Sequence, residues 1–147
     1  MMQAIIWDFN GTLYNPKEEK LFKGAKKLLK EASKKYKQAM VSAALLNPKK
    51  RRKLIKDLGI WYYFDYIRIN IKSPKMFLSV CNKFQCKPEE VYVIGDGYRK
   101  EIRTGNKLGM KTIWIDRKGK RSSWRDRLFK KRCWKRIDNM SMLESIL

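Results

Sequence analysis

The alternation of short apolar runs with amphipathic stretches is the feature that most constrains the fold of this chain. Ala4–Asp8, Gln38–Ser42 and Val91–Gly95 are short, largely apolar runs of the kind that form buried strands. Between the first two, Lys17–Tyr36 carries apolar residues at helical spacing beneath a lysine-rich face, which predicts one long helix. Strands that alternate with helices predict an α/β fold, a Rossmann-like doubly wound, mostly parallel sheet covered on both faces.

The same alternation continues along the rest of the sequence. Further strands are predicted at Tyr66–Ile71, Lys111–Asp116 and Trp134–Asp138. Further helices are predicted at Pro48–Leu58, Pro74–Phe84, Arg99–Leu108 and Met140–Leu147. The pattern contains no repeat and no linker, and 147 residues of which 44% are hydrophobic suffice for one core. We therefore expect a single domain over residues 1–147.

The charge balance is the strongest compositional signal. The chain has 36 Lys and Arg against 14 Asp and Glu, a net charge of +22. Such an excess favours polyanionic partners: nucleic acid, an anionic membrane surface or a phosphorylated substrate. The longest apolar stretch, Ala39–Leu46, is far too short to span a bilayer, which excludes an integral membrane protein. Asp8 interrupts the only apolar run that resembles a leader, so we expect a cytoplasmic protein.

The absence of histidine excludes several kinds of site. Without His the chain cannot build a Ser-His-Asp triad or a His-ligated zinc site. Its three cysteines, Cys81, Cys86 and Cys133, cannot complete a four-cysteine site either. We expect them to be reduced thiols that belong to the core.

Polar residues follow the predicted strands at the points where the strands end. In chain order they are Asp8, Ser42, Lys72, Lys75, Asp96 and Glu101. In a doubly wound sheet, ligands bind outside the carboxyl ends of the strands, so these side chains belong to one edge. Carboxylates without histidine suit Mg²⁺, and a carboxylate can also attack phosphorus.

These segments resemble the four motifs of the haloacid dehalogenase-like (HAD) hydrolase superfamily. The corresponding elements are Asp8-Phe9-Asn10-Gly11-Thr12-Leu13, the strand-ending Ser42, a lysine at the next crossover, and Gly95-Asp96 with Glu101 beyond it. Lys87–Asp96 and Lys107–Thr112 are also similar to HAD phosphatases. The resemblance covers nearly the whole chain and implies a HAD core.

The resemblance implies a magnesium site and a nucleophile. Asp8 would attack the phosphoryl group, and its carboxylate would also bind Mg²⁺. The main-chain carbonyl of Asn10 and the carboxylate of Asp96 would complete the protein ligands. Glu101 would bind through water or support the ligands from behind.

The resemblance also implies a set of groups for the phosphoryl oxygens. Thr12, Ser42 and the amide of Ala43 would hold these oxygens. Lys72 would neutralise charge on the phosphoryl group and the nucleophile, and Lys75 is the competing choice for this lysine.

Asn10 departs from the family's usual pattern. Phosphatases of the superfamily usually have aspartate there, as the acid for the leaving oxygen and later the base for water. Asparagine cannot transfer a proton, and general acid–base help is worth about 10²–10⁴-fold. We therefore expect a slow or selective Mg²⁺-dependent phosphohydrolase. The alternative is a HAD-fold protein with weakened catalysis that binds nucleic acid or an anionic membrane surface.

The spacing of the motifs indicates that the cap domain of many HAD enzymes is missing. About thirty residues separate Asp8 from Ser42, and about thirty more separate Ser42 from Lys72. One crossover helix with its loops fills each interval. An uncapped site is open, which suits an accessible phosphate on a large substrate such as nucleic acid.

The segment 117–136 is unusually basic, with eleven Lys and Arg and one acid in twenty residues. Its aromatic residues alternate with arginines, a pattern typical of nucleic-acid binding. A solvated surface and a membrane-surface segment are the alternatives, and Lys49–Lys53 would extend the same basic rim. The predicted nucleic-acid-binding residues are Arg121, Trp124, Arg125, Arg127, Lys130, Lys131 and Arg132.

Overall fold

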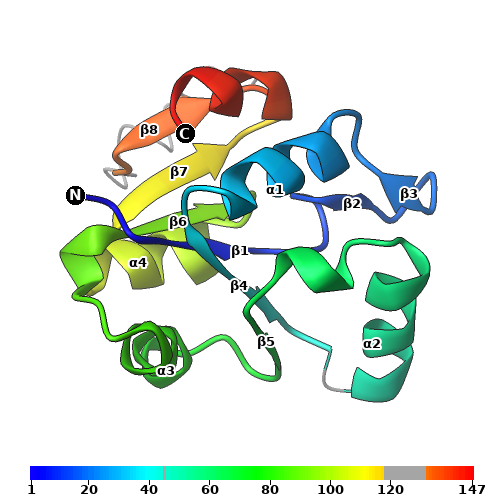
Figure 1. Cartoon of the computed structure of the whole chain (residues 1–147), viewed down its shortest axis with the longest axis horizontal. Coiled ribbons are helices and arrows are strands. Elements are labelled where there is room, and N and C mark those ends of the chain that lie inside the picture. The colour runs from blue at the N-terminus through cyan, green and yellow to red at the C-terminus, as the bar shows by residue number, and fades with distance from the viewer. Residues whose placement is uncertain (45, 118–131) are drawn as a thin grey trace.

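Six parallel strands form the central sheet in the order β5-β4-β1-β6-β7-β8 (Figure 1). The computed structural model describes residues 1–44, 46–117 and 132–147. The strands are β1 (Ala4–Trp7), β4 (Lys37–Ser42), β5 (Tyr66–Ile69), β6 (Val91–Gly95), β7 (Lys111–Ile115) and β8 (Lys135–Ile137). The predicted Rossmann-like, mostly parallel sheet is confirmed.

Helices cover both faces of this sheet. One face carries α1 (Ala25–Ser33), α2 (Pro48–Asp57) and the 3₁₀ helix η4 (Met140–Ser145), and the other carries α3 (Pro74–Phe84) and α4 (Arg103–Lys107). Along β1, Ile5 and Trp7 join the core on the first face, while Ala4 and Ile6 join the core on the second. Among the described residues, no helix is long and apolar enough to cross a bilayer.

The strand order reverses between β1 and β6. From β1 the chain moves outward to β4 and β5, then returns to β6 on the other side of β1 and continues to β7 and β8. A reversal of this kind leaves a crevice at the carboxyl ends of the two central strands. Asp8 and Asp96 follow those two strands directly, so the topology places both carboxylates at the crevice.

The prediction of one helix over Lys17–Tyr36 was wrong in its first part. A two-stranded hairpin, β2 (Tyr14–Asn15) and β3 (Lys20–Leu21), comes first, and α1 begins only at Ala25. The hairpin lies near the carboxyl edge of the sheet in Figure 1.

Two turn-forming residues explain why the helix begins late. The Asn15 side chain accepts a hydrogen bond from the Lys17 amide at 3.0 Å. This bond closes a turn around Pro16, so the chain turns here and does not begin a helix. Gly24, the residue before α1, has a φ of +84°, which lies outside the right-handed helical region. A helix that began earlier in the chain could therefore not continue through Gly24 into α1. The apolar residues Leu21 and Phe22 pack against the core from the hairpin side instead.

Short helices of other kinds complete the fold. The predicted helix Arg99–Leu108 consists of a π-helical turn, η3 (Tyr98–Ile102), that continues into α4. The predicted C-terminal helix is the 3₁₀ helix η4. Two further 3₁₀ helices are η1 (Trp61–Tyr63) and η2 (Pro88–Glu90).

Candidate active site

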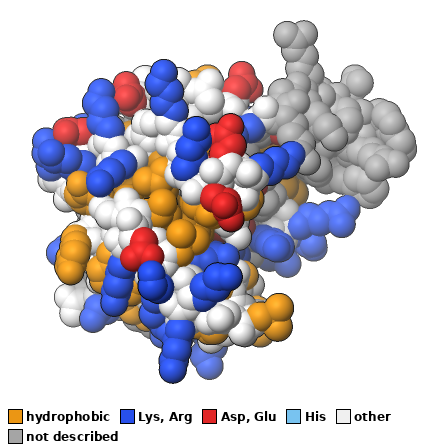
Figure 2. All heavy atoms as spheres, turned by 90° about the vertical axis from the view of Figure 1, so that its right-hand side faces the viewer, with side chains coloured by type: hydrophobic (Ala, Val, Ile, Leu, Met, Phe, Trp, Pro, Cys, Tyr) orange, Lys and Arg blue, Asp and Glu red, His pale blue; other side chains and the backbone are white. Residues whose placement is uncertain are grey.

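A cavity of about 950 Å³ opens at the carboxyl edge of the sheet. Figure 2 shows the molecule from this side, with many Lys and Arg side chains on the surface. The cavity brings together seven of the predicted residues from separate segments of the chain. They are Asp8, Asn10, Ser42, Ala43, Lys72, Asp96 and Glu101.

Asp8 is fixed at the end of β1. Its amide donates to the Ile94 carbonyl at 3.0 Å, which extends the pairing with β6 by one residue. Its side chain is only 5% exposed, and the Thr12 hydroxyl donates to Oδ2 at 3.3 Å. Thr12 is fully buried beneath the carboxylate and does not line the cavity. The structure therefore places Thr12 as a partner of Asp8.

The loop after Asp8 turns tightly because Gly11 permits it. The Phe9 carbonyl accepts hydrogen bonds from the amides of Thr12, Leu13 and Tyr14 at 2.9 to 3.2 Å. Gly11 has a φ of +78°, and a Cβ there would lie 2.0 Å from Oδ2 of Asp96. A side chain at this position would displace Asp96, so the loop requires glycine.

Lys72 joins two of the buried carboxylates. Its Nζ lies 2.5 Å from Oδ1 of Asp8 and 3.1 Å from Oε2 of Glu101. Burial alone lowers the pKa of Lys72, but the two carboxylates outweigh that effect, and the pKa is raised overall. Lys75 is exposed and does not line the cavity. Of the two lysines, Lys72 is the one that contacts Asp8.

Asp8, Asp96 and Glu101 form what we call the acidic cluster. Each supplies a carboxylate oxygen, and the three oxygens lie within 4.8 Å of one another. Burial, followed by repulsion from Asp8, raises the pKa of Asp96 to about 6 and that of Glu101 to about 7. Three carboxylate oxygens at this spacing fit a divalent cation such as Mg²⁺.

The π-helical turn η3 positions Glu101. Its Oε1 accepts a hydrogen bond from the Gly97 amide at 2.9 Å, and the side chain passes over Gly95. A Cβ at Gly95 would lie 2.3 Å from the Cγ of Glu101, so glycine leaves the space that Glu101 occupies. Single π-turns within helices occur frequently at functional sites, because they rotate one side chain out of the regular pattern.

Ser42 has an arginine partner that sequence reasoning did not single out. Its buried Oγ accepts a hydrogen bond from Nη1 of Arg51 at 2.5 Å. The guanidinium also lies over the Phe9 ring, 4.9 Å from its centroid. Because α2 begins at Asn47-Pro48, with the Asn47 side chain accepting from the Lys50 amide, Arg51 falls one turn into the helix and lies beside the end of β4. Nothing in the run Lys49–Lys53 distinguishes this position by composition.

Arg117, at the start of the predicted basic segment, binds the loop of Asp8. Its guanidinium donates to the carbonyl oxygens of Gly11 and Thr12, the second at 2.8 Å, and lies over the Phe22 ring. Burial lowers the pKa of Arg117, and Asp96 opposes that shift. This arginine connects the end of β7 to the loop that follows Asp8 and to the hairpin, a contact that the sequence did not predict.

Most of the predicted nucleic-acid-binding residues cannot be placed. Arg121, Trp124, Arg125, Arg127, Lys130 and Lys131 lie outside the described residues. Arg132 is exposed, and its backbone amide donates to the Tyr98 hydroxyl at 2.8 Å. That bond anchors the chain as it enters β8, beside η3.

Known proteins resemble this chain in sequence and in fold. Residues 14–115 match the haloacid dehalogenase-like hydrolase family. A 78-residue segment is 37% identical to a glyceraldehyde 3-phosphate phosphatase of Methanopyrus kandleri, over 49% of this chain and 33% of that protein. A phosphoserine phosphatase of Thermus thermophilus is 26% identical over 105 residues, 66% of this chain and 41% of that protein. The chain thus spans less than half the length of these two curated relatives.

The fold agrees over a longer stretch than the sequence does. The crystal structure of a HAD phosphatase from Thermococcus onnurineus covers 99% of this chain and 97% of its own, with a TM-score of 0.79 and 17% identity. Asp8 precedes the segment matched by the family, and its place at the end of β1 comes from the fold. With a family match over more than half of its length and the same sheet, the chain belongs to the haloacid dehalogenase-like hydrolase family.

Proposed function

We propose that this chain is a Mg²⁺-dependent phosphohydrolase that transfers a phosphoryl group to Asp8 and then to water. The buried contact between Lys72 and Asp8 carries the proposal, because it places an ammonium 2.5 Å from the carboxylate that would attack phosphorus. The phosphatase names of the two curated relatives support the same reaction class.

The acidic cluster supports a magnesium site in this mechanism. Asp8, Asp96 and the main-chain carbonyl of Asn10 would hold the ion, with Glu101 behind them. When bound, Mg²⁺ supplies positive charge that reduces the repulsion between these carboxylates and the phosphoryl oxygens. Burial and the neighbouring Asp8 carboxylate raise the pKa values of Asp96 and Glu101, so their charged forms carry a free-energy cost that a bound cation would lower.

In the transfer step, Asp8 would attack phosphorus while other residues of the cavity bind the phosphoryl oxygens. An oxygen of Asp8 forms a bond to phosphorus, the bond to the leaving oxygen breaks, and its electron pair departs with the leaving group. Ser42, the amide of Ala43 and the ammonium of Lys72 hold the phosphoryl oxygens during this step. Water then attacks phosphorus, the bond between phosphorus and the Asp8 oxygen breaks with its electron pair returning to the carboxylate, and the protons of the water leave with the released phosphate.

Asn10 is the reason to expect a low rate of hydrolysis. Its side chain is exposed in the cavity, where it can donate a hydrogen bond to a leaving oxygen but cannot protonate it. Leaving groups that are stable as anions should therefore react faster than alkoxides.

We propose a capless, single-domain core that acts on an accessible phosphate of a large or polyanionic substrate such as nucleic acid. Only the hairpin and α1 separate β1 from β4, and only α2 and η1 lie between β4 and β5 within the described residues. The Lys and Arg side chains that line the cavity favour the same class of substrate, and they are Lys17, Arg51, Lys72, Arg99, Lys100 and Arg117. Small phosphorylated metabolites are the competing class, in line with the names of the curated relatives.

A two-stage assay tests this function. The first stage measures hydrolysis of p-nitrophenyl phosphate with Mg²⁺ and with EDTA, and the reaction should require the metal. The second compares oligonucleotides carrying a terminal phosphate with glyceraldehyde 3-phosphate and phosphoserine. Faster hydrolysis of the two metabolites would overturn the polyanionic substrate and keep the phosphatase.

A catalytically weakened binding protein is the second candidate, favoured by Asn10. It predicts tight, steeply salt-dependent binding of DNA or RNA in a protein that hydrolyses none of these phosphates. Efficient metal-dependent hydrolysis would contradict it.

A further inference from the structure

Arg51 is a half-buried cation in the cavity whose partners are not anionic. Its guanidinium donates to the Ser42 hydroxyl at 2.5 Å and lies over the Phe9 ring. Among the described residues, no carboxylate lies within salt-bridge distance of it. Asp8 is close enough to raise its pKa, against the larger lowering by burial, and the guanidinium keeps its charge.

The other cations of α2 behave differently. The helix carries Lys49, Lys50, Arg51, Arg52, Lys53 and Lys56, and of these only Arg51 lines the cavity. Arg52, the next residue, is exposed. A partly desolvated guanidinium needs compensation that a neutral hydroxyl and an aromatic face supply only in part. Its position therefore favours an anion that enters the cavity.

The contact with Ser42 leaves donors free for that anion. A hydroxyl that accepts a hydrogen bond from Arg51 still has its own proton to donate. The guanidinium has five N–H groups in a planar fork, and its bond to Ser42 uses one of them. Both residues can therefore bind oxygens of one tetrahedral group beside Asp8.

We propose that Arg51 is a phosphoryl-binding residue that, together with Ser42, binds the oxygens of the group transferred to Asp8. The proposal rests on the proposed phosphohydrolase function and adds a residue of α2 to its machinery. Lys72 contacts Asp8 and Arg51 contacts Ser42, so two cations reach the phosphoryl group through different segments of the chain. The ligand class is a phosphoryl group or inorganic phosphate.

Arg51→Gln tests this role, with Arg52→Gln as the matched control. Both variants remove one positive charge from adjacent positions of α2, but only the first alters the cavity. We would measure kcat and KM for p-nitrophenyl phosphate, and the binding of inorganic phosphate by calorimetry with Mg²⁺ present. Arg51→Gln should lower kcat/KM by about 10²-fold, the effect of losing one oxyanion donor, and should weaken phosphate binding by about 10-fold. Arg52→Gln should change each by less than about 3-fold.

The ionic-strength dependence of each substitution's effect distinguishes a specific contact with phosphate from the long-range attraction of a basic protein. The small effect of Arg52→Gln should vanish at high ionic strength, whereas that of Arg51→Gln should persist because its contacts are partly buried. Arg51→Lys keeps the charge without the fork and should give an intermediate loss. It also serves as the decisive variant if Arg51→Gln fails to fold.

The outcomes distinguish this inference from the proposed function. Equal, salt-screened effects of the Arg51 and Arg52 variants would overturn the role of Arg51 and leave the Asp8 mechanism standing. A protein that hydrolyses no phosphate monoester but binds phosphate through Arg51 would support the anion site and contradict the phosphohydrolase. A wild-type protein that binds no inorganic phosphate with Mg²⁺ would overturn the site.

Discussion

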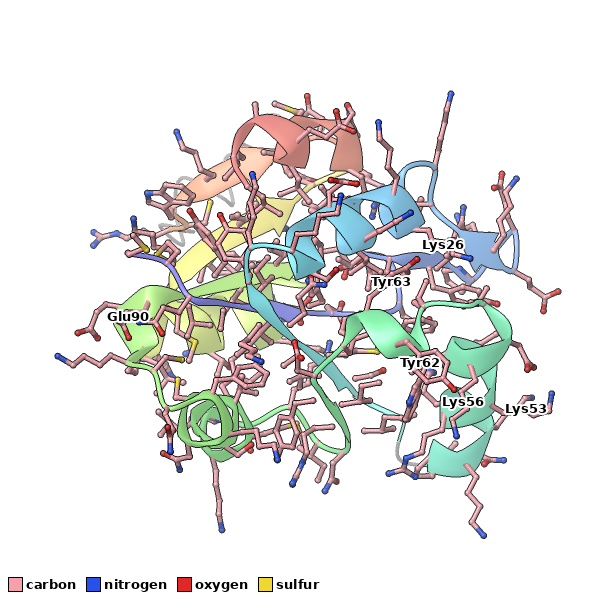
Figure 3. The ribbon with its side chains drawn as sticks, in the orientation of Figure 1. Lys26, Lys53, Lys56, Tyr62, Tyr63 and Glu90 are labelled. Atoms are coloured by element: carbon pink, nitrogen blue, oxygen red, sulfur yellow. The ribbon has the colours of Figure 1, made fainter. Side chains whose placement is uncertain are left out.

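The acidic cluster and the outer face of α2 carry opposite charges and hold them in opposite ways. In the cluster, three carboxylates lie within 4.8 Å of one another, and two of them pair with the buried Lys72. On α2, Lys53 extends away from the sheet (Figure 3) and pairs with Asp57 at 2.7 Å on an exposed surface. An exposed pair of this kind contributes about 0–1 kcal/mol, because water screens both charges. In the cluster, partial loss of solvent and the neighbouring Asp8 carboxylate raise the pKa values of Asp96 and Glu101 instead.

This contrast teaches that the net charge of +22 does not locate the site. Most of the described lysines are exposed to solvent, so they would act on a charged binding partner mainly through the long-range field of the protein. The proposed chemistry depends on a few acids that the topology gathers at the reversal point between β1 and β6. Substitutions matched in charge but not in position should therefore have very different effects.

Removing the proposed nucleophile should have the largest effect. Asp8→Asn keeps the size of the side chain but leaves a poor nucleophile, so kcat should fall by about 10⁴-fold or more. Asp57→Asn, which removes an exposed acid from α2, should leave kcat unchanged. Steady-state hydrolysis of p-nitrophenyl phosphate measures both. Comparable rates in the two variants would place the reaction elsewhere.

The two lysines at the third predicted motif offer the next comparison. Lys72→Gln should lower kcat by about 10²–10³-fold because the phosphoryl group loses a preorganised cation. It should also destabilise the metal-free protein by about 3 kcal/mol, since buried carboxylates lose their partner. Lys75→Gln, at an exposed position, should change neither quantity. Urea unfolding and the same assay would decide, and a larger effect at Lys75 would refute the assignment.

Restoring a proton donor at Asn10 should produce a moderate gain. Asn10→Asp should raise the rate on alkyl phosphates by about 10-fold, within the range of general-acid catalysis. The gain on p-nitrophenyl phosphate should be smaller, unless hydrolysis of the phosphorylated Asp8 is limiting. Mg²⁺ affinity should change little, because the ligand proposed at this position is the main-chain carbonyl. A variant inactive on every substrate would favour the binding protein.

The smallest effect concerns the pH dependence of stability in the metal-free protein. The pKa of Glu101 is raised to about 7, so the folded state binds a proton more tightly than the unfolded state. Its contribution to the free energy of unfolding is present at low pH and is lost as the pH rises through about 7, and Asp96 acts similarly up to about 6.

Glu101→Gln removes the part of this dependence that Glu101 contributes. Relative to wild type, the Tm of the variant should rise by about 5 °C between about pH 5 and pH 8, given the size of such shifts. Glu89→Gln, at an exposed position of η2, should follow the wild-type curve. Differential scanning calorimetry in EDTA measures all three proteins. A parallel wild-type and Glu101→Gln curve would show that Glu101 is ionised throughout this range.

The sequence was a good guide where apolar pattern and strand ends coincide. Buried parallel strands appear as continuous apolar runs, so Val91–Gly95 and the helix Pro74–Phe84 were predicted with their bounds. The carboxyl ends of parallel strands lie at one edge of the sheet, so the polar residues that follow them lie close together, and seven predicted residues line one cavity. The hairpin was missed because Leu21 and Phe22 fit a helical spacing equally well, although Asn15 and Gly24 were available as signals.

The arginines of the site could not be chosen from the sequence. Arg51 belongs to an unbroken basic run, and Arg117 begins another, so composition gives each the same weight as its neighbours. Their roles depend on where α2 begins relative to β4 and on where β7 ends relative to the loop of Asp8. Those are tertiary distances, which a one-dimensional pattern does not contain.

Trapping the phosphorylated enzyme tests the central claim most directly. The protein would be mixed with a phosphoryl-labelled substrate and Mg²⁺, quenched in acid and digested, and the labelled peptide identified by mass spectrometry. We predict a metal-dependent, hydroxylamine-sensitive label on the peptide that contains Asp8, absent from Asp8→Asn. Steady hydrolysis with a label on Ser42, or with a label that persists in Asp8→Asn, would contradict the account.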